Sequence, residues 1–400
     1  MKRAIVALAL TLCGANMAHA QSVAAAVDSA LSTPPFDAAL WFVLVEDESG
    51  KIVYERNATK LAIPASVRKL FTAATVATCL DVESRLETQL WLDGDDVVIK
   101  GGGDPSFGSD RYGYEPESVA LGPFVHALRE RGIVRVRDVI ADVSMFDRVT
   151  LPYQWKVGNI TGDSAAPVDA LVWSENDMGS TAVPSPGHFA ADAFRQALEA
   201  SGMAVSGAIR TQTEPRAWAE HLSTIPSPFV YDLLATVLKP SHNLFAETLL
   251  KRVSAFGEKP ASYDQSREME RAFLVGEVGI DTNTFRFVDG SGLAPDDLVT
   301  PAAIVRMLRW MNAPARRSTY WNLLPAPGER EGTLRARLTP FSDRLRAKTG
   351  TVAGVNSLAG IIAGRNGGHR YFAVIVNHHL GSSGAANRLI DAIVAAAADF

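Results

Sequence analysis

The stretch PASVRKLFTAAT, residues 64–75, places a lysine where a buried helix is expected. Pro64 and Ser66 are typical of a helix start. Apolar and small residues follow from Leu70 onward and leave no charged face, which predicts that the helix is buried. Lys69 lies one turn beyond Ser66. Because positions i and i+3 of a helix share a face, the Lys69 amine can reach the Ser66 hydroxyl.

A lysine beside a serine can act as the base of a nucleophilic reaction. The serine hydroxyl is a weak nucleophile until a base takes its proton. Lysine is a base only when neutral, so its ordinary pKa of about 10.4 must fall, and burial or a nearby cation lowers it. The alternative is that Ser66 caps the helix while Lys69 extends to solvent. Taken alone, the four residues favour this second interpretation.

Two later tripeptides could also belong to a site. Lys348-Thr349-Gly350 ends a strand-like run, where the lysine and threonine can bind a carboxylate and the glycine lets a substrate backbone lie close. A solvated lysine before a turn is the alternative. Ser241-His242-Asn243 precedes a helix, with Ser241 as a proton relay and Asn243 as an amide clamp, or with both as ordinary helix caps. Each tripeptide alone favours the structural interpretation.

In combination the three patterns are specific. The order Ser-x-x-Lys, Ser-x-Asn, Lys-Thr-Gly is the signature of penicillin-binding proteins and serine β-lactamases. The chain most resembles the penicillin-binding protein 4 type of D-alanyl-D-alanine carboxypeptidase, the class C low-molecular-mass group. Five more stretches match that group: GGGDPSF (101–107), AAPVDAL (165–171), SHNLFAE (241–247), DGSGL (289–293) and GTLRARL (332–338). The 174 residues between Ser66 and Ser241 require an insertion, as in that group.

The resemblance implies a serine D,D-peptidase that removes the terminal D-alanine from peptidoglycan stem peptides, and that could also cleave D,D cross-links. It implies these roles: Ser66 as nucleophile, Lys69 as general base, Ser241 as proton donor to the leaving D-alanine, Asn243 as holder of the substrate amide, and Lys348 and Thr349 as carboxylate binders. Gly350 belongs to the substrate-binding strand. The backbone N–H groups of Ser66 and Thr351 would form the oxyanion hole. The charge of Lys348 would help to lower the pKa of Lys69. No metal or cofactor is needed, and β-lactam antibiotics would be covalent inhibitors.

The implied fold is α+β, an antiparallel sheet flanked by helices with an inserted second domain. We expect a discontinuous catalytic domain of residues 21–85 and 226–400 and an inserted domain of residues 86–225. A hairpin over 39–57 should lie beside the C-terminal strands. Helices are expected near 117–131, 188–201 and 229–253, and at the C-terminus. The dozen residues between Asn176 and Phe189 are too few for the third domain of larger relatives.

Composition limits the setting in which the protein works. The net charge is −5 with no basic stripe, which argues against nucleic acid as a partner. Residues 1–20 have a basic start, the apolar run AIVALALTLCGA and the small residues Ala18 and Ala20, which predicts a signal peptide and a periplasmic protein. No later run could span a membrane. Cys79, the one cysteine of the mature chain, and His378 and His379, adjacent on a predicted strand, are expected to be structural.

Two alternatives share the scaffold. A serine β-lactamase needs rapid deacylation, and no clear motif for a glutamate-held water is found. A non-catalytic peptidoglycan-binding relative would not be acylated at Ser66.

Specificity is a separate question, because many members of the group place three polar side chains around the diaminopimelate of the stem peptide. The equivalents here are Asn159, Pro295 and Ala353, which predicts little preference for a free diaminopimelate end.

Overall fold

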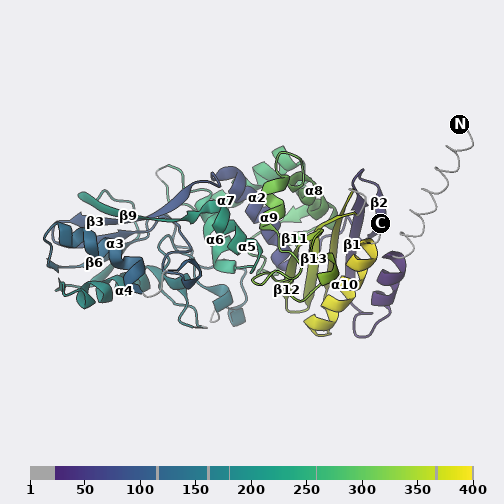
Figure 1. Ribbon diagram of the computed structural model, residues 1–400, viewed down its shortest axis with the longest axis horizontal. Helices are drawn as coiled ribbons and strands as arrows, with labels where there is room; N and C mark the ends of the chain where they lie inside the picture. Colours follow the sequence, from purple (N-terminus) through teal and green to yellow (C-terminus); the bar gives the residue numbers. More distant parts are fainter. Residues whose placement is uncertain are drawn as a thin grey trace, which may run out of the picture.

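The structure is a computed structural model that describes residues 23–113, 117–159, 163–179, 181–257, 259–364 and 368–398. The predicted signal peptide, residues 1–20, lies outside the described residues. The molecule is elongated, with one sheet near each end and a group of helices between them (Figure 1). Among the described residues, no helix is both long and apolar enough to cross a membrane.

The first sheet joins the two ends of the chain. Its strand order is β12-β13-β14-β1-β2, and all neighbours are antiparallel. The strands are β1 (Leu40–Asp47), β2 (Ile52–Arg56), β12 (Leu345–Val352), β13 (Val355–Ala363) and β14 (His369–Asn377). Strands β13 and β14 are buried on both faces, so their side chains are apolar almost without interruption. The predicted hairpin and its place beside the C-terminal strands are confirmed.

Helices cover both faces of this sheet. Helix α10 (Ser383–Ala398) packs on β13 and β14, and its apolar residues share a core with Trp41, Val43 and Val45 of β1. On the other face lies α8 (Pro301–Met311), and behind it α2 (Lys69–Cys79). Helix α2 contacts α5 (Val230–Leu238), α6 (Asn243–Arg252), α7 (Tyr263–Phe273) and α8. Being enclosed by four helices explains why α2 carries no charged face. A short helix, α9 (Arg317–Leu323), packs on α5.

The second sheet is built from the middle of the chain. Its order is β8-β6-β4-β3-β9, from β3 (Arg85–Asp93), β4 (Asp96–Lys100), β6 (Val139–Asp142), β8 (Ile209–Gln212) and β9 (Glu220–Phe229). It is mixed, because β6 pairs in parallel with both β4 and β8. Helices α3 (Glu117–Glu130) and α4 (Pro186–Ala200) pack together and share its core. Strand β9 continues across position 225/226, where we expected a boundary, so the division into domains stays a prediction.

Short elements complete the fold and show one departure from expectation. Two further pairs of strands are β5 (Arg135–Val136) with β7 (Ala204–Val205), and β10 (Phe285–Arg286) with β11 (Leu298–Val299). The expectation that His378 and His379 lie on a strand was wrong, because β14 ends at Asn377 and His378 has φ 60°. Buried His379 contacts Asn356 through Nε2 at 2.8 Å. Between Asn176 and Phe189 the structure places a bridge from Asp177 to Ala182 and the start of α4.

Candidate active site

A tight turn presents Ser66 at the start of the buried helix. Residues Ala65–Arg68 form a 3₁₀ turn that runs directly into α2 at Lys69. Ala65 has φ 49°, a left-handed conformation that is uncommon for a residue other than glycine. Between residues 64 and 76, Ser66 is the one residue that is not fully buried. The turn therefore brings a single hydroxyl to the surface of an otherwise enclosed segment.

The Lys69 amine lies within hydrogen-bond distance of that hydroxyl. Lys69 is fully buried, and its Nζ is 2.9 Å from Ser66 Oγ. The same nitrogen is 2.7 Å from Asn243 Oδ1 and 2.7 Å from the backbone oxygen of Ser291. A neutral amine has two N–H groups and one lone pair. If the two N–H groups bond to Asn243 and Ser291, the lone pair is left facing Ser66.

Burial makes the neutral amine accessible near physiological pH. It lowers the pKa of Lys69 to about 7, and the nearby guanidinium of Arg68 acts in the same direction. The buried carboxyl groups of Asp289 and Glu247 oppose the shift. The structure thus provides the repelling cation through Arg68, where the resemblance implied Lys348. Burial and the charge of Lys69 also lower the pKa of Lys348 well below its ordinary value.

Arg68 is held by a buried ion pair. Its two terminal nitrogens lie 2.7 and 2.6 Å from the carboxylate oxygens of Glu270 on α7, and its Nε donates to the backbone oxygen of Asp289 at 2.9 Å. The guanidinium also stacks on the ring of Phe287, 3.9 Å from its centroid. A bidentate pair of this kind fixes both position and orientation. The cation beside Lys69 is therefore a permanent part of the site.

Two buried carboxyl groups hold the loop of residues 289–293 against Lys69. Glu247 accepts the backbone N–H of Ser291 at 2.7 Å, and Asp289 accepts that of Gly292 at 2.7 Å. Burial would raise the pKa of Asp289, but hydrogen bonds from Asp297 and other donors keep it below its usual range. Ser291 is thereby placed with its carbonyl oxygen toward the Lys69 amine. The chemistry of Lys69 depends on this loop as much as on its own helix.

A second lysine and serine pair faces the first from the other side of the site. Lys348 on β12 is fully buried, and its Nζ lies 2.8 Å from Ser241 Oγ and 2.9 Å from the backbone oxygen of Thr349. Ser241 has φ 68° and lies two residues before the first residue of α6, Asn243. Its loop thus carries one residue that contacts Lys348 and another, Asn243, that contacts Lys69.

The next residues of β12 have different neighbours from those that the sequence indicated. The Thr349 hydroxyl is bonded to the Thr333 hydroxyl at 2.7 Å, so Thr333 joins the site. A Cβ on Gly350 would lie 2.7 Å from the backbone oxygen of Pro64 and 3.0 Å from the nitrogen of Ser66. In this structure the glycine lets β12 approach the nucleophile turn, whereas we had assigned its close approach to the substrate. Thr351 is exposed and accepts from Asn356 Nδ2 at 3.2 Å.

The middle of the chain contributes to the same site. Asn243 Nδ2 donates to the backbone oxygen of Ser164 at 2.7 Å, and because an amide carries two such hydrogens, one remains for another acceptor. Trp155 donates through Nε1 to Asp289 at 2.8 Å. Trp155 also packs against Ala294, just after the loop of residues 289–293. Residues from the early, middle and late parts of the chain therefore meet at this candidate site.

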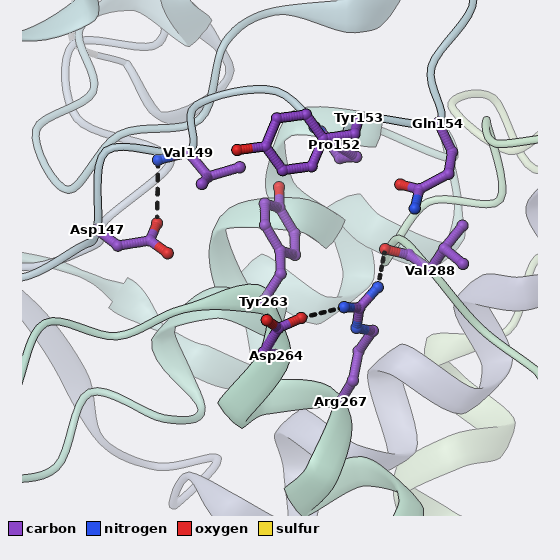
Figure 2. Close-up of a pocket in the computed structure, with 9 residues that line it drawn as sticks. All are labelled: Asp147, Val149, Pro152, Tyr153, Gln154, Tyr263, Asp264, Arg267 and Val288. Carbon is purple, nitrogen blue, oxygen red and sulfur yellow. Dashed lines mark hydrogen bonds and ion pairs between the residues drawn. The ribbon is translucent and has the colours of Figure 1, made fainter.

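Two of the pockets lie where the middle segment meets α6 and α7. A polar pocket of about 300 Å³ is lined by Ser241, His242 and Asn243 together with residues of the middle segment: Arg111, Ser164, Glu175 and Asp177. A smaller one of about 80 Å³ lies between α7 and residues 147–154 (Figure 2). Figure 2 shows Arg267 bridging Asp264 and the backbone oxygen of Val288, the residue before Asp289. This second pocket is lined by none of the motif residues. The first pocket is lined by Ser241 and Asn243, so it is the one that adjoins the candidate catalytic residues.

The sequence-predicted residues come together, but several contacts around them were missed. Ser66, Lys69, Ser241, Asn243 and Lys348 form two hydrogen-bonded groups. The specificity candidates lie apart in the chain: Asn159 in a 3₁₀ turn, Pro295 half-buried beyond the loop of residues 289–293, and Ala353 exposed between β12 and β13. The missed residues are Arg68, Thr333, Glu175, Glu247 and Asp289. Three of them, Glu247, Asp289 and Thr333, lie inside sequence stretches that match the group, and this match could have indicated that they belong to the site.

Chemically, the site combines a nucleophile, a base and a second proton carrier. Ser66 Oγ can lose its proton to the neutral Lys69 amine as it attacks a carbonyl. Ser241 Oγ is hydrogen-bonded to Lys348 Nζ, and its hydroxyl can pass a proton to a departing amine. Among the described side chains, Lys69 is the one that is hydrogen-bonded to Ser66 Oγ. The arrangement suits acyl transfer through a covalent serine ester.

Comparison with known protein families gives an independent result. A profile of the D-Ala-D-Ala carboxypeptidase 3 (S13) family matches residues 23–188 and 175–399. The chain is 29% identical over 381 residues to carboxypeptidase DacB of Mycolicibacterium smegmatis, covering 90% of this chain and 80% of that protein. It is 25% identical to the D-alanyl-D-alanine carboxypeptidase of an Actinomadura species, covering 94% of this chain and 86% of the relative.

Solved structures with the same fold span nearly the whole chain. Penicillin-binding protein 4 of Haemophilus influenzae superimposes with a TM-score of 0.80 at 20% identity, covering 90% of this chain and 94% of the other. A predatory peptidoglycan endopeptidase from Bdellovibrio bacteriovorus superimposes with a TM-score of 0.58 at 17% identity, covering 89% and 92%. At these identities the likeness concerns the fold. The predicted antiparallel sheet flanked by helices is confirmed by it.

Proposed function

The chain belongs to the D-Ala-D-Ala carboxypeptidase 3 (S13) family, and we propose that Ser66 is the residue that its substrate acylates. The protein is a serine-type D-Ala-D-Ala carboxypeptidase, a hydrolase of peptidoglycan stem peptides. One observation carries the assignment of the nucleophile. The hydroxyl of Ser66 is 2.9 Å from a fully buried amine whose pKa burial lowers to about 7. A base of that pKa is about half neutral at pH 7.

The proposed reaction proceeds in two stages. Ser66 Oγ attacks the carbonyl carbon of the penultimate D-alanine while Lys69 takes the hydroxyl proton, and the backbone N–H groups of Ser66 and Thr351 stabilise the developing oxyanion. The C–N bond then breaks, Ser241 gives a proton to the leaving D-alanine amine, and the proton that Lys69 took from Ser66 replaces the one that Ser241 lost. In the second stage water attacks the ester, which releases the shortened peptide and returns the proton to Ser66. Each oxyanion donor is worth roughly 3–4 kcal/mol in such reactions.

The substrate is held by three side chains in this proposal. Lys348 and Thr349 bind the terminal carboxylate, and the free N–H of Asn243 donates to the substrate amide. Burial disfavours the charged form of Lys348. An arriving carboxylate offsets that burial, so the substrate itself would favour the ammonium that binds it. Gly350 keeps the strand close to Ser66, as the 3.0 Å that would separate a Cβ at this position from the Ser66 nitrogen supports.

Benzylpenicillin tests the proposed nucleophile. Intact-mass spectrometry after incubation should show one adduct on the wild-type protein and none on Ser66→Ala. Lys69→Met, of similar length but unable to accept a proton, should slow adduct formation strongly while leaving the fold intact. An adduct that persists in Ser66→Ala would place the nucleophile elsewhere. The structure of the Haemophilus protein with a bound β-lactam supports this choice of reagent.

Three further assays separate the related activities. Release of D-alanine from a stem pentapeptide measures carboxypeptidase activity, and cleavage of a D,D-cross-linked dimer measures endopeptidase activity. Rapid, repeated turnover of nitrocefin would instead indicate a β-lactamase. A protein that forms no adduct and cleaves neither peptide would be a peptidoglycan-binding relative without catalysis.

We also infer export to the periplasm, where peptidoglycan stem peptides lie. The basic Lys2 and Arg3, the apolar run after them and the small residues Ala18 and Ala20 support a signal peptide of residues 1–20. N-terminal sequencing of the protein from a periplasmic fraction should begin at Gln21. Recovery of an intact Met1 in that fraction would contradict the inference.

A further inference from the structure

A strained turn at residues 174–176, in the middle segment, contacts the segment of residues 241–243, here called the catalytic loop. Ser174, Glu175 and Asn176 have φ values of 47°, 57° and 53°, three consecutive left-handed residues without a glycine. The turn is maintained by buried Asn176, whose side chain donates to the backbone oxygen of Pro167 at 2.8 Å and accepts from the nitrogen of Trp173 at 3.2 Å. Such conformations persist only where the surroundings fix them, and they gather at functional sites.

The carboxylate of Glu175 collects three donors. Oε1 accepts from Ser109 Oγ at 2.5 Å and from Arg111 Nε at 2.9 Å, and Oε2 accepts from His242 Nε2 at 2.8 Å. Burial alone would raise the pKa of Glu175, but the hydrogen bonds from His242 and Ser109 and the charge of Arg111 lower it to about 2. The group is therefore a fixed anion at neutral pH. Two of its donors come from its own segment, and the third belongs to the catalytic loop.

His242 depends on Glu175 for its orientation. The ring is mostly buried and packs edge-on against Phe245, with centroids 4.8 Å apart. Its Nδ1 is buried and has no hydrogen-bond partner among the described residues. We therefore place the ring proton on Nε2, which donates to the Glu175 carboxylate. Nδ1 then carries only a lone pair, which costs less to bury than an N–H without an acceptor. Among the described residues, Glu175 makes the one polar contact with the ring, and this contact orients it.

His242 lies between the two residues that serve the two lysines. Ser241, before it, bonds to Lys348 and has φ 68°, while Asn243, after it, bonds to Lys69. The backbone at residues 241–243 must therefore present neighbouring side chains to two different partners. We propose that Glu175 is a positioning residue of the reaction: through His242 it fixes the loop that presents Ser241 and Asn243. This rests on the roles proposed above for Ser241 and Asn243.

The proposal is tested by steady-state kinetics and by the rate of acylation by benzylpenicillin. Glu175→Gln keeps the size of the side chain, but its amide cannot accept all three donors. We expect kcat and the acylation rate to fall about tenfold, with KM within about twofold and an unchanged melting temperature. Asp391→Asn is the matched control, because Asp391 pairs with Arg337 at 2.7 Å, is similarly buried and contacts no motif residue. It should behave as the wild type.

A double-mutant comparison shows whether Glu175 acts through His242. His242→Ala should lose about as much activity as Glu175→Gln, and the double variant should be no worse than His242→Ala alone. His242→Gln keeps an N–H near the position of Nε2 and should recover most of the activity. Losses that multiply in the double variant would overturn the proposal, as would equal activities of His242→Ala and His242→Gln.

The same experiments separate this inference from the function on which it rests. If Ser241→Ala is impaired while Glu175→Gln retains wild-type kcat, Glu175 is not a positioning residue and the proposed reaction stands. If Ser66→Ala is still acylated, the proposed reaction itself fails. If Glu175→Gln lowers the melting temperature, the comparison of His242→Ala with His242→Gln decides, because neither changes the strained turn. Wild-type activity in His242→Ala would then overturn the proposal.

Discussion

Gly350→Ala should slow acylation by moving the strand β12 away from Ser66. The added Cβ would lie 2.3 Å from Ser357 Oγ, 2.7 Å from the backbone oxygen of Pro64 and 3.0 Å from the nitrogen of Ser66. The backbone at Gly350 does not have positive φ, so alanine can adopt its conformation. The effect of the substitution is therefore steric.

The size of the effect follows from these distances. The Ser357 hydroxyl can rotate, but the Pro64 oxygen is backbone, and ordinary contact at 3.4 Å requires β12 and the turn to separate by about 0.7 Å. Overpacking of this kind typically costs about 1–3 kcal/mol of stability. A misplacement near 1 Å can cost about a hundredfold in rate. We expect the acylation rate to fall between about tenfold and a hundredfold, since Ser66, Lys69 and Lys348 are all retained and only their spacing changes.

Stopped-flow acylation by nitrocefin or benzylpenicillin measures this rate, and thermal unfolding measures the accompanying loss of stability. Gly122→Ala is the control, because Gly122 lies within α3 and a Cβ there meets nothing within 4 Å. It should be stabilised by about 0.5–1 kcal/mol with unchanged acylation. An acylation rate for Gly350→Ala within about threefold of the wild type would refute the reasoning.

The remaining predictions concern the two lysines and specificity. Because the pKa of Lys69 is lowered to about 7 and the neutral amine is the base, the acylation rate should rise with pH through about 7 and level above it; a flat profile from pH 5 to 9 would contradict this. Lys348→Met should reduce kcat/KM for a peptide ending in D-Ala-D-Ala by about tenfold to a hundredfold, and much less for the same peptide amidated at its C-terminus; equal losses would exclude Lys348 as the carboxylate binder. Because Asn159 carries no charge and Pro295 and Ala353 offer no side-chain hydrogen bond, pentapeptides with diaminopimelate and with N-acetyl-lysine should be hydrolysed at similar kcat/KM. A strong preference for diaminopimelate would show that other residues recognise it.

The sequence alone determined the features that depend on local spacing. Ser66 and Lys69 are three residues apart, and the apolar residues after them leave the helix no exposed face, so a buried amine beside a hydroxyl could be predicted. Two strand-like runs on either side of a turn at Asp47–Gly50 likewise predicted the hairpin of β1 and β2. These features involve neighbours in the chain, whose geometry is fixed by the helix or strand itself.

The other residues of the site could be predicted from the order of three sequence motifs along the chain. Ser241, Asn243 and Lys348 were predicted from three short patterns whose combination is rare, even though each pattern alone is common. The structure brings them within hydrogen-bond distance of one another or of Lys69. Nothing in their spacing predicts this contact, since 174 residues separate Lys69 from Asn243.

Only the tertiary structure decided how the site is tuned. The cation that repels Lys69 is Arg68, and the groups that oppose the shift are Asp289 and Glu247, more than 170 residues away in the chain. The neighbour of Gly350 is the Ser66 turn, and His242 is oriented by Glu175 from the middle segment. A pKa depends on burial and on the charges that packing brings near, and packing joins segments that carry no local signal of one another.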